Sequence, residues 1–232
     1  MEQKIPFTSY DFWAYLSAGF VVLAAVDYVS SAHLLYRDTW TVVQGVMAMV
    51  CAYTAGQMVA SLASFLYEKL LVSRLLGAPR MVLFGQPKAW RVVRWAVPGF
   101  FEPLPLATQR AVLERAAPVG IDGPGEGLFW CAFAYARGTP SVMGRLENFL
   151  NLYGFARNVS LAAFVDALLL YWHYRWNKGN DLALALARAA LLVGVGMLLR
   201  YLKFYRQYAL EVFTSYAHSP KESAKPAEGA KP

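Results

Sequence analysis

The chain has 232 residues, of which 57% are hydrophobic and only 16% are charged, and its net charge is +7. Soluble domains carry roughly a quarter charged residues, so this balance argues against an ordinary soluble domain and favours a membrane protein. The two cysteines, Cys51 and Cys131, have no paired spacing, which argues against a disulfide framework or a zinc site.

The N-terminal third contains two apolar stretches that are long enough to cross a bilayer, which takes about 20 residues. The first covers about 12–28 and has no convincing cleavage site behind it, so we expect it to remain as a membrane helix. The second covers about 40–66, and its helix is predicted to continue to Gly77, a stop that Pro79 reinforces. Residues 1–77 are therefore predicted to form a transmembrane hairpin whose second helix extends into the cytoplasm.

The second stretch carries a small side chain at every fourth position, namely Ala48, Ala52, Gly56, Ala60 and Ser64. No water is expelled when helices associate in lipid, so association depends on small residues that let two backbones approach closely. The stripe therefore predicts a close helix contact. Its partner is either another span of the same monomer or a second copy of the chain, and both alternatives stay open at this point.

Residues 78–156 are too long for a turn and are predicted to form a cytoplasmic helical subdomain between the second and third spans. Helical patterns cover about 106–117 and 128–138, with a cluster of turn-forming glycines and a proline between them. Thr139 and Pro140 then form a typical helix start, and the helix that begins there is expected to lead into the third span.

Two further apolar stretches, about 157–176 and 182–200, predict a second transmembrane hairpin within residues 157–217, whose last helix extends into the cytoplasm. Residues 218–232 are polar and rich in Pro, Ala and Lys, which predicts a disordered tail. The predicted fold class is an all-α integral membrane protein. Its four transmembrane helices form two hairpins, with a cytoplasmic helical subdomain between helices 2 and 3.

The lysines and arginines indicate how the four spans are oriented. Residues 67–157 contain eleven of them and the chain from residue 200 onward contains six, whereas the connections 27–40 and 173–181 contain one and two. Cytoplasmic connections are enriched in Lys and Arg. We therefore expect a multi-pass protein of a bacterial-type inner (plasma) membrane, with both termini in the cytoplasm.

Two charged residues, Asp166 and Arg188, lie inside apolar runs, where an isolated charge costs about 3 kcal/mol. The outer turn centres near Asn177, and each of the two residues lies eleven positions from it. Antiparallel helices would bring them to the same depth, which predicts an intramembrane ion pair. Such a pair either locks the hairpin or lines a water-filled path; in a third alternative they do not touch and Arg188 reaches the outer interface.

Other polar residues accompany the spans. Gln44 and Gln57 are expected to face inward because an amide in hydrocarbon needs a hydrogen-bond partner, and Asp27 is expected to anchor the first span at its interface. A basic collar at the inner leaflet is predicted to attract anionic lipid, and it consists of Arg157, Arg200, Lys203 and Arg206. Nucleic-acid binding is disfavoured, because the inside preference of Lys and Arg alone produces such collars.

No catalytic, cofactor or metal motif is recognisable, and the clustered acids Glu102, Asp122 and Glu126 are typical of turns and caps. The sequence favours a non-enzymatic assembly module, expected to be oligomeric, that couples a cytoplasmic helical domain to the membrane and could form a pore. Its expected partner is a second copy or another membrane or cytoplasmic protein. The alternative is an ion- or proton-coupled channel or transporter subunit that uses Asp166 and Arg188. A membrane-embedded lipid-modifying enzyme is the least favoured alternative.

Overall fold

The computed structural model describes residues 12–35, 39–89, 91–177 and 180–219, and the regular structure in these ranges is helical throughout, with no β-strand. The predicted tail lies outside the described residues apart from His218 and Ser219. In chain order the elements are η1 Phe12–Leu16, α2 Ser17–Ser30, α3 Val42–Ala63, η2 Ser64–Leu76, α4 Pro79–Val82, α5 Arg91–Ala96, α6 Pro98–Phe101, α7 Leu106–Ala116, η3 Ala117–Val119, α8 Glu126–Arg137, α9 Pro140–Trp176 and α10 Asp181–Ala217.

Four helices in the described ranges are long and apolar enough to cross a membrane. They lie within Trp13–Ser30, Val42–Val82, Pro140–Trp176 and Asp181–Ala217. The structure thus confirms the predicted all-helical fold and its four membrane-length helices.

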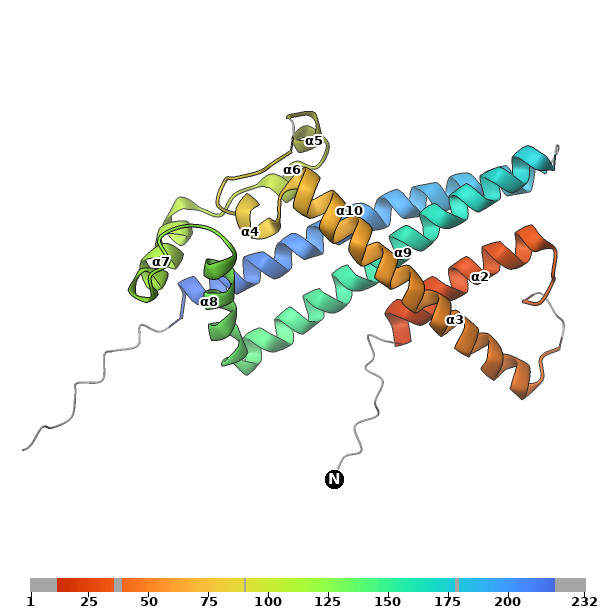
Figure 1. Ribbon diagram of the computed structural model, residues 1–232, viewed down its shortest axis with the longest axis horizontal. Coiled ribbons are helices and arrows are strands. Elements are labelled where there is room, and N and C mark those ends of the chain that lie inside the picture. The colour runs from red at the N-terminus through yellow and green to blue at the C-terminus, as the bar shows by residue number, and fades with distance from the viewer. Residues whose placement is uncertain (1–11, 36–38, 90, 178–179, 220–232) are drawn as a thin grey trace, which may run out of the picture.

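The two longest helices, α9 and α10, run antiparallel and side by side along the molecule (Figure 1). Each has 37 residues, or about 55 Å at 1.5 Å per residue. Pro140 occupies the first turn of α9, where its missing N–H costs nothing, and the Asn180 side chain caps α10 by accepting from the Ala183 N–H at 3.1 Å. Their register is fixed where the Ser160 hydroxyl donates to the Gly194 carbonyl at 2.8 Å.

The first hairpin packs against one half of this pair. Helix α2 contacts both α3 and α9, and α3 crosses in front of α9 in the view of Figure 1. Helix α3 continues without interruption into the π-helix η2, which ends at Gly77 with a φ of 98°. That backbone conformation favours glycine, so the helix ends at the residue that the sequence predicts.

The short helices α4–α8 gather over the other half, with α7 and α8 at the end where α9 begins and α10 finishes and α5 and α6 nearer the middle (Figure 1). Helix α8 buries Leu128, Ala132 and Ala136, which are four residues apart and lie on one face. They belong to a core that both long helices share, and its buried members are Leu83, Phe84, Leu104, Val112, Ala116, Leu128, Ala132, Ala136, Val142, Leu146, Ala209, Val212, Phe213 and Ala217. We call α4–α8 the helical subdomain.

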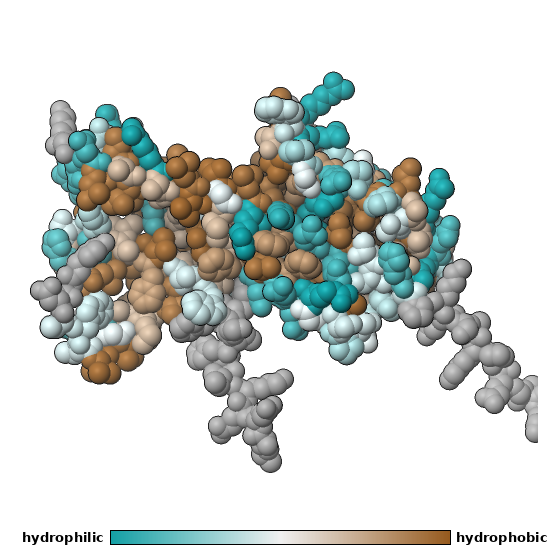
Figure 2. All heavy atoms as spheres, turned by 180° about the vertical axis from the view of Figure 1, so that it is seen from behind, coloured by the Kyte–Doolittle hydropathy of each residue, from teal (hydrophilic) through white to brown (hydrophobic). Residues whose placement is uncertain are grey.

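The surface divides along the same axis. Hydrophobic residues gather over the half that carries α2 and the α9–α10 turn, whereas hydrophilic residues dominate around the helical subdomain (Figure 2). Large apolar side chains are exposed along α3 and α10, including Val42 at 85%, Met58 at 71% and Leu192 at 73%. Soluble monomers rarely expose apolar patches this extensive, so the surface is consistent with a multi-pass membrane protein.

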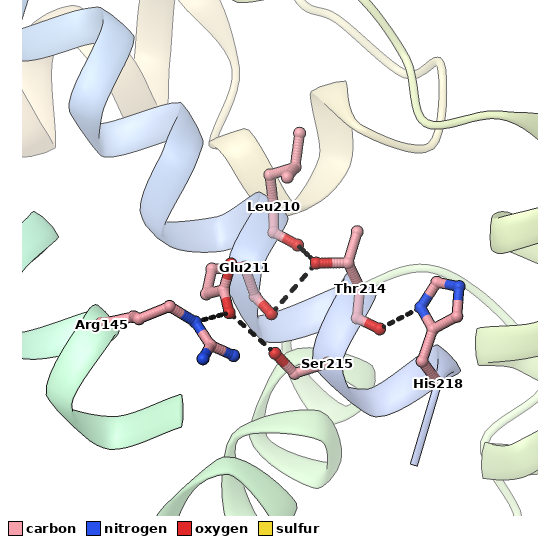
Figure 3. Close-up of polar contacts among 6 residues, drawn as sticks. All are labelled: Arg145, Leu210, Glu211, Thr214, Ser215 and His218. Carbon is pink, nitrogen blue, oxygen red and sulfur yellow. Dashed lines mark hydrogen bonds and ion pairs between the residues drawn. The ribbon is translucent and has the colours of Figure 1, made fainter. Parts of the chain in front are cut away.

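Polar contacts close the subdomain end of the long pair (Figure 3). Arg145 of α9 donates from Nε to Glu211 Oε1 of α10 at 2.7 Å, and the Ser215 hydroxyl donates to the same oxygen at 3.1 Å. His218 Nδ1 lies 2.7 Å from the Thr214 carbonyl oxygen, which also accepts from the His218 backbone N–H at 3.1 Å. These contacts hold the first turns of α9 against the last turns of α10.

Candidate functional site

The small-residue stripe on α3 packs inside the monomer, against η1 and α2. Ala52, Gly56 and Ala60 are buried, while Ala48 and Ser64 at the two ends are half-buried. A Cβ atom built on Gly56 would lie 1.9 Å from the Tyr15 carbonyl oxygen. A Cβ built on Gly19, on the facing helix, would lie 1.7 Å from the Ala52 carbonyl oxygen. The two backbones are therefore in direct contact, and only glycine fits at either position.

Asp166 and Arg188 lie at the same level of the long pair, but their side chains do not meet. The register set by Ser160 and Gly194 places one opposite the other. None of the four ion pairs formed by the described residues joins them. Asp166 is 4% exposed, whereas Arg188 is exposed and lines a surface hollow of about 470 Å³ between α9 and α10. The predicted ion pair is thus absent, because one side chain points inward and the other outward.

Asp166 is buried on the face of α9 that packs against the first hairpin. Asn158 lies eight residues earlier, a little over two turns, and its amide donates to the Ala14 carbonyl at 3.4 Å. Further along, the rings of Tyr28 and His173 are 5.7 Å apart, so α2 runs parallel to α9 past Asp166. Among the described residues the Asp166 Oδ1 atom has no hydrogen-bond partner. An unpaired buried polar atom is costly and therefore marks a candidate functional group.

Asp27 fastens the loop that follows α2 to the end of that helix. Its carboxylate accepts from the backbone N–H groups of Leu34 at 2.8 Å and Leu35 at 3.0 Å, and the residue is 6% exposed. The loop turns through Ser31 and His33, both with positive φ. The interfacial anchoring role of Asp27 stays a prediction. Asp27 also lines an apolar hollow of about 340 Å³ between α2 and α3.

The two glutamines on α3 find partners within their own helix. The Gln44 side-chain oxygen accepts from the Thr41 backbone N–H at 3.0 Å. The Gln44 backbone N–H in turn donates to the Thr41 hydroxyl at 3.3 Å, and the two bonds form a capping box. Gln44 is exposed and does not face inward. Gln57 donates to the Tyr53 hydroxyl at 2.9 Å, one turn away. Tyr53 in turn packs edge-on against Tyr15 of η1, so Gln57 supports the helix contact indirectly.

Two members of the predicted basic collar form ion pairs or hydrogen bonds with residues of the same chain. Arg157 forms an ion pair with Glu68 of η2. Arg206 is 8% exposed and donates to the Glu102 carbonyl at 2.7 Å. Burial lowers the pKa of Arg206, and the nearby Glu102 carboxylate opposes that shift.

The other two collar members remain at the surface. Arg200 and Lys203 are both exposed and lie over the Phe204 ring, at 4.9 and 6.0 Å from its centroid. Of the predicted collar, only Arg200 and Lys203 are therefore exposed at the surface, where a cation could contact a lipid phosphate.

A tyrosine junction, which sequence reasoning missed, joins η2 to the long pair. The hydroxyls of Tyr67 and Ser160 lie 3.0 Å apart, and Ser160 donates onward to α10. The Tyr67 and Tyr201 rings are 5.7 Å apart, and Tyr153 packs against Tyr201 at 6.3 Å. Burial raises the pKa of Tyr153 and of Tyr201 well above the ordinary range. The spacing of Tyr201, Tyr205 and Tyr208 along one face was the signal that could have revealed the junction.

The described residues contain no group of three or more His, Cys, Asp or Glu side chains that could hold a metal ion. Two of the three acids noted in the sequence pair with different arginines, because Glu102 contacts Arg206 and Glu126 contacts Arg80. No family model, curated protein or solved structure matches the chain.

Proposed function

We propose that the chain is a non-enzymatic, multi-pass membrane module that couples the helical subdomain, on the cytoplasmic side, to its membrane helices. The observation that carries this proposal is the continuity of α9 and α10. Each is one unbroken helix that contributes to the subdomain core at one end and is apolar enough to span a membrane at the other.

The packing of the subdomain supports coupling rather than loose tethering. Phe213 of α10 is fully buried, and its ring packs edge-on against Phe84 at 5.1 Å and Phe129 at 6.0 Å. Leu146 of α9 lies in the same core. Packed cores shift as units between alternative arrangements, so a displaced subdomain displaces both long helices.

The tyrosine junction extends the coupling to the first hairpin. Tyr67 and Glu68 of η2 contact Ser160 and Arg157 of α9. Since η2 is continuous with α3, movement of the long pair reaches α3 directly.

The inner-membrane location, the cytoplasmic termini and the expected oligomer belong to this proposal. The uneven distribution of Lys and Arg supports the orientation. Because the small-residue stripe is used inside the monomer, a second copy or another membrane protein would contact the exposed apolar faces of α3 or α10. A pore would require such an assembly. Arg200 and Lys203 are the groups offered to anionic lipid.

Hydrogen exchange on the full chain in lipid nanodiscs tests the coupling. Phe213→Ala removes a fully buried ring from the subdomain core, and Leu106→Ala, at a position that is 69% exposed on α7, is the control. We expect Phe213→Ala alone to speed amide exchange in η2 and α3 as well as in α4–α8. Faster exchange confined to the subdomain, in a variant that keeps its helical content, would contradict the proposal.

A second candidate function, an ion- or proton-coupled channel or transporter subunit, is favoured by the buried Asp166 Oδ1 atom, which has no hydrogen-bond partner among the described residues. Intramembrane carboxyl groups frequently mark proton or ion pathways. This function predicts that Asp166→Asn abolishes proton flux into liposomes that contain the protein. Arg188→Gln should leave that flux intact, because Arg188 does not contact Asp166. Unchanged flux in Asp166→Asn, or no flux in the parent protein, rejects the candidate.

A further inference from the structure

A cavity of about 280 Å³ lies between the helical subdomain and the long pair. One wall comes from α4 and α8, and the other comes from α9 and α10. Most of its lining is aromatic, and these residues are Phe129, Trp130, Phe133, Tyr153, Tyr205 and Tyr208. Two arginines, Arg80 and Arg137, complete its polar part, and we call the whole the arginine–tyrosine pocket.

Most hydrogen-bond donors of this pocket have no partner in the described part of the chain. Arg137 lies over the Phe133 ring, with Cζ 5.0 Å from its centroid, and makes no ion pair there. The Tyr205 and Tyr208 hydroxyls likewise donate to no described residue. Arg80 has one weak partner, Glu126, at 3.7 Å. Two guanidinium groups on the α4–α8 wall and two hydroxyls on the α10 wall therefore remain available to an occupant.

The charges around the pocket favour an anion. Glu126, 67% exposed, is the only acidic partner of Arg80 among the described residues, and it also accepts from Trp130 Nε1 at 3.3 Å. Burial raises the pKa of Tyr205 to about 12 and also raises that of Tyr208, so both hydroxyls stay protonated and can donate at neutral pH. Guanidinium groups bind phosphate oxygens in a bidentate manner, and aromatic faces accept a flat or apolar attachment.

The position of the pocket along α10 is also informative. Tyr205 and Tyr208 lie five and eight residues beyond Arg200, where the fourth predicted span ends, which corresponds to about 8–12 Å along the helix. The polar headgroup layer of a bilayer is roughly 5–8 Å thick on each side. A lipid phosphate can therefore come close to the pocket, and a soluble phosphate compound can reach it from the cytoplasmic side.

We propose that the arginine–tyrosine pocket binds a phosphate group that carries an apolar or aromatic attachment. Arg80 and Arg137 hold the phosphate oxygens, the tyrosine hydroxyls donate to them, and the α8 aromatics cover the attachment. The phosphate displaces Glu126 from Arg80. Since the walls belong to both the subdomain and the long pair, an occupant holds the two together.

Binding is tested on the full chain in two arms. In the soluble arm, phenyl phosphate is titrated into protein in nanodiscs of neutral phosphatidylcholine, with phenol as the uncharged control and thermal stabilisation as the readout. In the membrane arm, native mass spectrometry counts phosphatidylglycerol retained from mixed nanodiscs. Binding in the soluble arm alone identifies a soluble ligand, and binding in the membrane arm alone identifies a headgroup; either result supports the proposal.

The variants separate this pocket from general surface charge. Arg80→Gln and Arg137→Gln should each weaken binding about tenfold, the effect of one lost charge-assisted hydrogen bond. Arg74→Gln, at an exposed position outside the pocket, is the matched control and should bind like the parent. Glu126→Gln should bind more tightly because the competing carboxylate is gone. The proposal is overturned by no binding in either arm, by phenol binding as well as phenyl phosphate, or by equal losses in Arg74→Gln and the pocket variants.

Discussion

Gly19 and Gly56 are the residues at which the first hairpin tolerates no side chain at all. Each faces a backbone carbonyl of the opposite helix rather than a movable side chain. Backbone cannot give way without displacing a whole helix, so the cost of an added methyl group falls on the helix contact itself. Gly45, on the same helix α3, has nothing within 4 Å of a built Cβ and provides the matched comparison.

We therefore expect Gly56→Ala to destabilise the protein by about 3 kcal/mol or more, at or above the upper end of ordinary overpacking. Gly45→Ala should be neutral or stabilising by up to about 1 kcal/mol, because alanine is the better helix former. Thermal unfolding in mild detergent, followed by circular dichroism, measures both. Equal stability of the two variants would show that the backbones are not in contact.

A second prediction at the residue scale concerns Asp166 and Arg188. Because their side chains do not meet, the effects of Asp166→Asn and Arg188→Gln on the free energy of unfolding should add within about 0.5 kcal/mol. A double-mutant cycle measures the coupling. A coupling energy well above that value would show that Asp166 and Arg188 interact, as the sequence predicts, and would contradict the structure, in which they form no ion pair.

At the scale of elements, the tyrosine junction is where three helical segments meet through phenol groups. Tyr153, Tyr201 and Tyr205 pack ring against ring, with centroids 5.1 to 6.3 Å apart. Burial raises the pKa of all three, and the Glu68 carboxylate adds to each shift. The junction therefore favours neutral phenols. Its packing should weaken at alkaline pH, where the tyrosines ionise.

The sign of that dependence follows from the direction of the shifts. Tyr205 has a pKa of about 12 in the folded protein and an ordinary value of 10.0 when exposed. Its contribution to stability is complete below pH 10 and is lost as the pH rises toward 12. We expect the melting temperature in detergent to fall over this range, and to fall less steeply in Tyr205→Phe. An identical decline in parent and variant would contradict the assignment.

The elements also show what sequence alone can predict. The end of η2 at Gly77 and the start of α9 at Pro140 depend on local backbone preferences, and both were predictable. The shared depth of Asp166 and Arg188 follows from the constant rise of a helix. Their opposite orientations do not, because the rotation of α9 is set by its contact with the first hairpin. The loss of Arg157 and Arg206 from the collar likewise depends on Glu68 and Glu102, acids distant in sequence.

At the scale of the whole molecule, apolar surface lies toward one end and charged surface toward the other, and two helices connect them. This arrangement predicts which positions are reachable from each side of a membrane. In the proposed orientation, Arg175→Cys as the single cysteine, at an exposed position near the C-terminal end of α9, should react with a membrane-impermeant maleimide in intact cells. A single cysteine at Glu147, exposed near the start of the same helix, should react only after permeabilisation.

Both variants are made in a background without Cys51 and Cys131. The reverse labelling pattern would invert the proposed orientation, and equal labelling of both positions in intact cells would remove the membrane assignment.

The glycine contact gives the first hairpin a mechanical property of its own. Helices α2 and α3 touch at Gly19 and Gly56 and diverge from there toward the connection between them (Figure 1), where the hollow of about 340 Å³ lies. The rod formed by α3 and η2 thus has a pivot partway along its length. If η2 tilts about this contact, the other end of α3 must move in the opposite direction, so we expect the width of the hollow between α2 and α3 to change with the tilt of η2.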